Sequence, residues 1–448
     1  MTRDMRDRLT RALERGDVRS AGSSLGPGMR KRLERALTGS GHEGDSPLPR
    51  VYSARQMSEP VVGKDRAAFS AKLSEQELET PQGPVMQYRW SVPLKELQKA
   101  QDLDGASRGA GVLSELLENP SIEGLDLSRV LFIDTETTGL AGGTGTYVFL
   151  MGMGWLEGKE FIVEQLFMRD FIEEQALLWR TAQLADEYDL LVSFNGRRYD
   201  IPLLDTRLIL NRVDCRLAGK PHLDLLQPAR LLYSGIFDNC RLQTLEKELM
   251  GQYRYGDVPG AEIPRLFFEY LSSGDAASLL PVFEHNVLDV VTLLTLTAHF
   301  LHLCQKPELD PRALGGLGRL YSRRGNEDLA RELLEEARSR RKATYRDLSD
   351  LGHLYKRSGE HSKALEVWKA LISRQERVSH DLGFDSGPYV EAAKHYEHRT
   401  KDFEKALEFT TAALQQVASA NGRAPSRRLV DELDHRVTRL RRKLDHSA

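Results

Sequence analysis

The stretch VLFIDTETTGL, Val130 to Leu140, decides the fold of the chain around it, and AGGTGTYVFL follows it directly. Its first four residues, Val130 to Ile133, have the apolar pattern of a buried strand. Asp134 and Glu136 come next, and side chains two positions apart in a strand point to the same face. A divalent cation would relieve the repulsion between two such carboxylates, and hard oxygen ligands favour Mg²⁺ or Mn²⁺ over zinc. Taken alone, the pair is equally compatible with turn formers at a strand end.

The region from 128 to 304 alternates short apolar runs with helical segments, which predicts an α/β layer fold with a mixed central sheet flanked by helices. We predict strands over 130–133, 147–155, 161–167 and 190–194. We predict helices near 173–186, 201–212, 241–250, 263–271 and 279–303.

Two further segments of this region carry acids in suitable places. LLVSFNGRRYDIPLL reads as a strand, an Asn-Gly turn and a helix that opens with Asp200, which is alternatively only a helix cap. FEHNVLDVVTLL is an apolar helix interrupted by His285 and Asp289, which lie on one face because they are four residues apart. Such groups are costly in a core unless something binds them. Another acid, Asp224 in HLDLL, ranks below Asp200 because no helix start follows it as clearly, and it is a candidate for a supporting position.

The three segments together, DxE, an Asp about 65 residues on and HxxxD about 85 residues further, resemble the DEDD exonucleases, the DnaQ-like branch of the ribonuclease H fold. The resemblance covers 128 to about 304. Within it, GGTGTY, SFNG and DVPGAEIP are similar to a bacterial subgroup that joins such a domain to tetratricopeptide (TPR) repeats. One feature departs from the pattern: three residues separate His285 from Asp289, where the usual His-type members have four. Three is the spacing of the Tyr-type members, so the subclass stays open.

The resemblance implies a metal-dependent 3′-to-5′ exonuclease, with DNA preferred over RNA, in a subgroup linked to DNA repair beside a helicase. It implies that Asp134, Glu136, Asp200 and Asp289 hold two Mg²⁺ ions, with Mn²⁺ as a substitute. His285, with an expected pKa near neutrality, would take the proton from the attacking water. Two alternatives stay open: an exonuclease directed at RNA, and a TPR scaffold whose nuclease-like domain is inert.

Candidate substrate contacts surround these segments. They are Thr135, Gly142, Gly143, Thr144, Asn195, Arg197 and Arg198. The glycines would let backbone amides approach a terminal nucleotide, but they are also ordinary turn residues. Arg197 and Arg198 would contact phosphates, or lie in an exposed loop, while Asn195 is better suited to ordering the turn. Core packing is the better interpretation of Tyr147 and Phe194.

The rest of the chain divides by composition and repetition. Residues 1–55 use Gly, Ser and Pro as flexible linkers do, and 56–127 read as a lead-in segment with an edge strand near 87–93 and a helix near 111–117. In 310–448, LGRLY at 317 recurs as LGHLY at 351, a displacement of 34 residues, which predicts TPR-like hairpins before a basic C-terminal helix.

The third predicted repeat departs from the first two. Its spacing from Tyr396 to Ala406 is ten residues, whereas the spacing from Tyr321 to Ala330 is nine. The groove of such hairpins is a plausible surface for a protein partner, a helicase in the resembled subgroup.

Composition limits the remaining classes of function. The 448 residues carry 63 basic and 66 acidic side chains, a net charge of -3, so any site for a polyanion must be local. The widely spaced cysteines, Cys215, Cys240 and Cys304, argue against disulfides or a zinc site and favour a reduced, cytoplasmic setting. The charged N-terminus and the lack of an unbroken apolar run of about 18 residues predict no membrane association.

Overall fold

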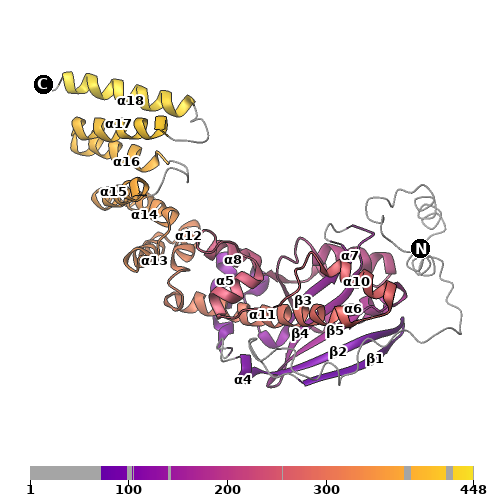
Figure 1. Cartoon of the computed structure of the whole chain (residues 1–448). Helices are drawn as coiled ribbons and strands as arrows, with labels where there is room; N and C mark the ends of the chain where they lie inside the picture. Colours follow the sequence, from indigo (N-terminus) through magenta and orange to yellow (C-terminus); the bar gives the residue numbers. More distant parts are fainter. Residues whose placement is uncertain are drawn as a thin grey trace. The chain divides into compact units, whose positions relative to one another are not determined.

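The computed structural model of the chain describes residues 72–97, 103, 105–139, 143–254, 256–377, 385–419 and 427–446. The flexible segment predicted over 1–55 and the predicted contact Gly142 lie outside these residues. The chain forms two compact units (Figure 1). The sheet unit takes Phe237–Lys306 and the described residues of Met1–Arg230. The helical unit takes Leu231–Ile236 and the described residues of Pro307–Ala448.

The described residues of the sheet unit form one mixed sheet of seven strands at its centre. The strands are β1 (Lys72–Thr80), β2 (Gly83–Pro93), β3 (Val130–Thr137), β4 (Val148–Glu157), β5 (Glu160–Phe167), β6 (Leu190–Ser193) and β7 (His222–Asp224). Their spatial order is β1-β2-β5-β4-β3-β6-β7, with antiparallel pairing from β1 to β3 and parallel pairing from β3 to β7. The four strands predicted from sequence are confirmed. Because β3 continues to Thr137, Asp134 and Glu136 lie within the strand and not in a turn after it.

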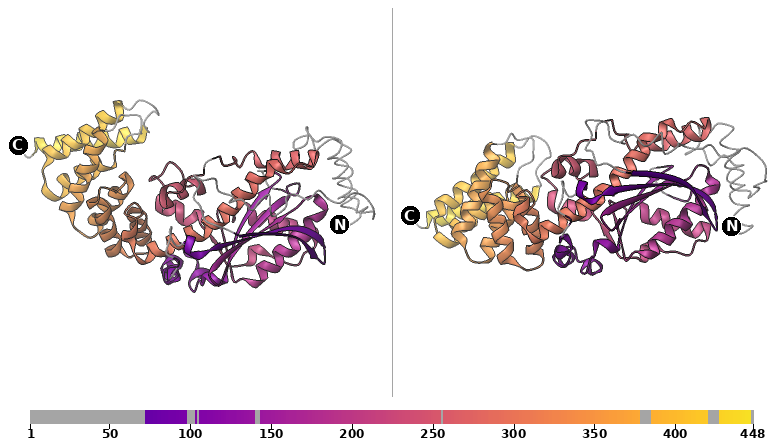
Figure 2. Two further views of the ribbon diagram at one scale, coloured as in Figure 1. Left: turned by 60° about the horizontal axis from the view of Figure 1, so that its bottom comes forward. Right: turned by 90° about the horizontal axis from the view of Figure 1, so that it is seen from below.

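Helices cover both faces of the sheet. Those that precede Lys306 are α4 (Leu94–Leu97), α5 (Ala110–Leu117), α6 (Glu174–Glu187), α7 (Asp200–Asn211), α8 (Leu226–Tyr233), α9 (Leu242–Leu245), α10 (Ile263–Ser273) and α11 (Leu280–Gln305). The long helix α11 lies along one face, and α6 lies with α7 on the other (Figure 2). The five helices predicted between 128 and 304 are confirmed, and the one near 241–250 starts as α9 and ends in a π turn over Glu246–Met250.

The strands β1 and β7 were not predicted, and the strand predicted near 87–93 was given the wrong position within the sheet. The edge strand expected near 87–93 is the interior strand β2, because β1 pairs with its outer side. The described residues of 56–127 therefore belong to the sheet unit and do not form a separate lead-in segment. The short strand β7 pairs with β6 and brings Asp224 to the same end of the sheet as Ser193.

The close approach of α11 to the sheet depends on a glycine in β4. A Cβ atom at Gly152 would lie 2.3 Å from Oδ1 of Asn286, so no larger residue fits there without movement. Asp134, Gly152 and Gln165 form one row across β3, β4 and β5. The side-chain amide of Gln165 donates to the Phe283 carbonyl and to Asn286 Oδ1, each at 2.9 Å. These contacts place the first turns of α11 directly over Asp134.

The same helix is long and apolar for a domain of this kind. By length and composition α11 could cross a membrane, since a window within Ala277–Gln305 has a mean hydropathy of 1.7, but 83% of that window is buried. The apolar residues of α11 are buried by the sheet and by α5, as in the core helix of a globular domain. This helix was predicted over 279–303, and the expectation of no unbroken apolar run of about 18 residues did not register it because polar residues interrupt it.

The helical unit consists of consecutive hairpins. Its helices are α12 (Leu314–Arg323), α13 (Glu327–Ser339), α14 (Tyr345–Arg357), α15 (His361–Arg377), α16 (Gly387–His395), α17 (Phe403–Ser419) and α18 (Arg427–Asp445). The repeated glycines allow the helices of a hairpin to approach closely, since a Cβ at Gly318 would lie 2.8 Å from Leu334 and one at Gly352 would lie 2.5 Å from Trp368. The repeat in sequence therefore corresponds to a repeated helix contact, and the all-helical region predicted after 310 is confirmed.

A π turn accounts for the irregular third repeat. Helix α16 ends in a π turn over Tyr396–Thr400, and a π turn accommodates one residue more than an α turn. The extra residue accounts for the spacing of ten from Tyr396 to Ala406, where the first repeat has nine. The turn also buries Glu397, whose carboxylate binds three cations of α18, namely Arg436, Arg439 and Lys443. Three of the basic side chains of α18 therefore contact one internal acid.

Candidate active site

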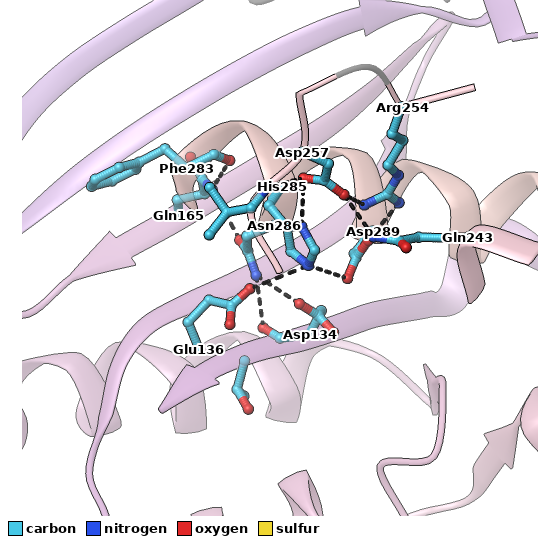
Figure 3. A network of polar contacts seen from close by, with 12 residues as sticks. Asp134, Glu136, Gln165, Gln243, Arg254, Asp257, Phe283, His285, Asn286 and Asp289 are labelled. Carbon is cyan, nitrogen blue, oxygen red and sulfur yellow. Dashed lines mark hydrogen bonds and ion pairs between the residues drawn. The ribbon is translucent and has the colours of Figure 1, made fainter. Parts of the chain in front are cut away.

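The carboxylates of β3 lie on the face of the sheet that α11 covers (Figure 3). Asp134 Oδ2 accepts a hydrogen bond from Asn286 Nδ2 at 2.9 Å. Burial raises the pKa of Asp134 well above its usual range, and the negative charges of Asp289, Glu136 and Asp200 raise it further. Burial also raises the pKa of Glu136, to about 8, against the opposing charge of His285, and the charges of Asp289, Asp200 and Asp257 add to the rise. Both carboxylates are therefore unstable as a neighbouring pair of anions without a further cation.

Asp200 reaches the same site from the other side of β3. It is the first residue of α7, and its Oδ1 accepts a hydrogen bond from the hydroxyl of Thr135. A Cβ atom at Gly196 would lie 3.1 Å from Asp200 Oδ2, so glycine leaves room for the carboxylate. Burial raises the pKa of Asp200 to about 6. The hydrogen bond from Thr135 lowers this pKa, and the charges of Asp224 and Asp289 raise it. Asp200 is thus held beside the β3 acids and is more than a helix cap.

Asp224 supports the turn that leads to Asp200. Its Oδ1 accepts from the Asn195 amide at 2.7 Å and its Oδ2 accepts from the Arg197 amide at 3.2 Å. Asn195 has a φ of 66°, in the left-handed region that Asn tolerates better than most residues. Behind it, Nε2 of His222 lies 2.8 Å from the hydroxyl of Ser193. The structure places Asp224 in the supporting position considered from sequence, and Asn195 orders the turn.

His285 and Asp289 lie one turn apart on α11 and face the β3 acids. Nε2 of His285 lies 4.0 Å from Glu136 Oε1 and 3.4 Å from Asp289 Oδ2. Burial opposes protonation of His285, but the charges of Asp289, Asp257 and Glu136 outweigh it and raise the pKa of the imidazole to about 10. In this arrangement His285 is protonated at neutral pH. The near-neutral pKa expected from sequence is therefore wrong for this arrangement, because three acids surround the ring.

Three residues of the site were not predicted from sequence. Asn286 is fully buried and joins Asp134 to α11. In the sequence, a second polar residue beside His285 in an apolar helix could have indicated it. Asp257 opens DVPGAEIP, and its Oδ1 lies 2.8 Å from Nδ1 of His285. Arg254 pairs with Asp289 at 2.5 Å, and no pattern in the sequence marked it.

Four of the predicted substrate contacts lie in exposed loops. Gly143 and Thr144 are exposed, and the Thr144 carbonyl accepts from Nη1 of Arg207 at 2.7 Å. Arg197 and Arg198 are exposed as well, and Nη2 of Arg197 donates to the His222 carbonyl at 3.2 Å.

The aromatic candidates and Thr135 have structural contacts. Tyr147 packs under Arg207, whose guanidinium carbon lies 3.9 Å from the ring centroid, and it also meets Phe171 edge to face. Phe194 is half-buried. Thr135 contacts Asp200, so in this structure its hydroxyl orients an acid of the site.

The donor set suits a hard divalent cation. Four acids, Asp134, Glu136, Asp200 and Asp289, come from β3, α7 and α11, and those of β3 and α7 have raised pKa values because they are buried beside one another. Oxygen ligands of this kind are those that Mg²⁺ and Mn²⁺ prefer. Within the described ranges, no three His, Cys, Asp or Glu side chains already converge as ligands of one ion. Asn286 contacts Oδ2 of Asp134 and Arg254 contacts Oδ1 of Asp289, so each of these acids would bind a cation through its other oxygen.

Comparisons with known proteins agree with this architecture. Residues 131–301 match the model of the RNase_H superfamily, a span that contains all of the predicted acids and His285. Over 344 residues the chain is 30% identical to the uncharacterized protein YprB of Bacillus subtilis (strain 168), covering 74% of this chain and 78% of that protein. Among solved structures, the family B DNA polymerase of Pyrobaculum calidifontis is similar at 15% identity with a TM-score of 0.32. That match covers 73% of this chain and 38% of the polymerase.

Proposed function

This chain belongs to the family of Bacillus subtilis YprB, and on that premise we propose that it is a metal-dependent exonuclease that hydrolyses phosphodiester bonds of nucleic acid. One observation carries the proposal: buried and half-buried acids from three distant segments lie close enough to raise one another's pKa values, and His285 lies beside them. A bound divalent cation would neutralise charge at the scissile phosphate and make water more acidic. Mutually repelling buried acids have no structural value of their own, since their burial destabilises the fold.

The roles of the residues follow from their positions. Asp134, Glu136, Asp200 and Asp289 would hold the cations, two Mg²⁺ ions with Mn²⁺ as a substitute. His285 would take a proton from the attacking water through Nε2, the ring nitrogen that faces the acids. Cations in the site would lower the pKa of His285 from about 10 toward neutrality, because the uncompensated acids are what raises it.

The finer parts of the proposal rest on the resemblance of the three segments to the DEDD exonucleases. They are 3′-to-5′ polarity, a DNA substrate and a role in DNA repair, whereas a cytoplasmic location is proposed from the widely spaced cysteines. The hairpins of the helical unit are TPR-like in their 34-residue repeat, and we propose that their groove binds a protein partner, a helicase by the same resemblance.

The test uses the full-length protein with single-stranded DNA, duplex DNA and RNA, each labelled at the 3′ or the 5′ end, in Mg²⁺, Mn²⁺ or EDTA. We expect stepwise shortening of DNA from its 3′ end in Mg²⁺ and none in EDTA. Asp200→Asn should be at least about 100-fold slower, because it removes a charged ligand. Asp214→Asn, which changes an exposed acid of the same unit, is the matched control and should keep the wild-type rate.

Each other result has a defined meaning. Unchanged substrates in all conditions would contradict the enzyme and favour a scaffold. Equal cleavage by Asp200→Asn would contradict the site. Faster shortening of RNA than of DNA would assign the enzyme to RNA.

A further inference from the structure

The segment that follows α9 reaches over the first turns of α11 (Figure 3). We call the described residues of 246–257 the strap. Two of its side chains, Asp257 and Arg254, contact the two functional groups of α11, His285 and Asp289. The strap therefore contacts both proposed catalytic groups of α11 directly.

Asp257 holds the imidazole of His285. Its Oδ1 accepts from Nδ1 of His285 at 2.8 Å and from the Val258 amide at 3.0 Å, and its Oδ2 accepts from Gln243 Nε2 at 2.7 Å. Burial opposes ionisation, but His285 and Arg254 outweigh it and lower the pKa of Asp257. An ionised carboxylate can only accept, so Nδ1 carries a proton and Nε2 is the atom directed at Glu136 and Asp289.

Arg254 holds the carboxylate of Asp289. Its Nη2 lies 2.5 Å from Asp289 Oδ1, its Nε donates to Glu246 Oε2 at 2.7 Å and its Nη1 lies 3.4 Å from Asp257 Oδ2. Glu246 is itself buried and accepts from the hydroxyl of Thr292 on α11. The guanidinium is thus fixed at several points. It occupies one oxygen of Asp289 and leaves Oδ2 on the side of His285.

We propose that the strap is a positioning element of the active site, in which Asp257 orients His285 and Arg254 orients Asp289. The inference rests on the proposed function and adds two residues that act through others. Both oxygens of Asp257 are already engaged by His285, Gln243 and the Val258 amide, which distinguishes it from the acids proposed to hold metal. Partners of this kind commonly change metal affinity or activity by about 10- to 100-fold when removed.

The test of Asp257 combines a spectroscopic and a kinetic measurement. In the metal-free full-length protein, the proton on Nδ1 of His285 should give a downfield NMR signal, assigned by its loss in His285→Gln. Asp257→Asn should move that signal upfield. The same change should lower kcat about 10- to 100-fold and leave KM within about twofold, because Asp257 orients the ring without touching the nucleic acid. Asp257→Glu should recover part of kcat, and Asp238→Asn, at an exposed acid, should change nothing.

The test of Arg254 measures the affinity for Mn²⁺ by calorimetric titration. Arg254→Lys keeps the charge and so protects the fold, but it cannot bridge Glu246 and Asp289 as a planar fork does. We expect Mn²⁺ to bind about tenfold more weakly to this variant. Arg265→Lys, at an exposed ion pair, is the control. Equal or tighter binding by Arg254→Lys would overturn the role of Arg254, since it would show that the guanidinium only competes with the cation.

The remaining outcomes separate the strap from the proposed function. An unchanged Nδ1 signal or an unchanged kcat in Asp257→Asn would overturn the strap while the enzyme stands. Failure of the wild type to bind Mn²⁺ or to cut any substrate would contradict the enzyme. In that case the NMR signal still decides whether Asp257 orients His285.

Discussion

A single buried amide aligns the helix and the strand that carry most of the site. Nδ2 of Asn286 donates to Asp134, and its Oδ1 accepts from Gln165 at 2.9 Å. Both sides of the amide are thus satisfied in the core, where an unpaired polar atom costs about 1 to 3 kcal/mol. Asn286 therefore specifies the rotation of α11 that brings its neighbour His285 over Glu136.

A buried histidine behind Asp200 makes the stability of the sheet unit depend on pH. Burial lowers the pKa of His222 to about 4, against the charge of Asp224, so the ring stays neutral beside Ser193. Between pH 6.5 and 4 the unfolded chain therefore binds a proton that the folded chain does not, and stability falls as the pH falls. From pH 7 to pH 5, we expect the free energy of unfolding of the wild type to fall by about 2 kcal/mol more than that of His222→Gln.

The measurement is urea unfolding of both proteins at the two pH values. The other titrating groups contribute equally to both proteins. The difference between their two losses of unfolding free energy is therefore the contribution of His222. Equal losses in the two proteins would show that His222 is not buried as a neutral ring.

At the scale of elements, the site depends on how closely α11 approaches β4. Where a helix packs on a sheet, side chains from both normally fill the space between them. At Gly152 the sheet contributes no side chain, so the helix lies closer. The side chain of Asn286 fills that space and reaches the row formed by Asp134 and Gln165. The position of α11, and with it the third acidic segment, thus depends on this close packing and on the hydrogen bonds of Asn286.

Gly152→Ala should disturb both the fold and the activity. The added Cβ would lie 2.3 Å from Asn286 Oδ1, and overpacking of this kind costs about 1 to 3 kcal/mol. We expect that loss in chemical denaturation, together with slower cleavage, because α11 or Asn286 must shift away from Asp134. Gly111→Ala on α5 is the control, since a Cβ there meets nothing within 4 Å. A loss below about 0.5 kcal/mol for Gly152→Ala would contradict the close contact.

At the scale of the whole molecule, the chemistry proposed for this protein belongs to one of its two units. The acids, His285 and the strap all lie in the sheet unit, whereas the helical unit has its own core, built around residues such as Leu351, Trp368 and Tyr389. A cation that binds only the folded sheet unit stabilises that unit alone.

Scanning calorimetry of the full chain tests this division. In excess Mn²⁺ over EDTA, we expect the unfolding transition of the sheet unit to move to higher temperature, by an amount that corresponds to about 2.7 kcal/mol when the ion is at 100 times its Kd. The transition of the helical unit should stay in place. Asp200→Asn should lose the shift, and an equal shift in this variant would place the cation elsewhere.

Much of this protein could be predicted because local spacing encodes faces and ends of elements. Alternation in β3 placed Asp134 and Glu136 on one side, and a separation of four residues placed His285 and Asp289 on one face of α11. The Asn-Gly turn placed Asp200 at the start of α7. These relations involve residues that are close in the chain, so they hold in any fold that keeps the element.

Long-range pairing decided the rest. Only the tertiary structure could show that β1 covers the outer side of β2, that β7 supplies Asp224, and that Arg254 and Asp257 meet α11. The charged state of His285 likewise depends on acids from three separate segments. Sequence determined which groups each element presents, because backbone geometry repeats locally. Structure decided which groups meet and how their pKa values change, because packing and burial depend on partners that are distant in the chain.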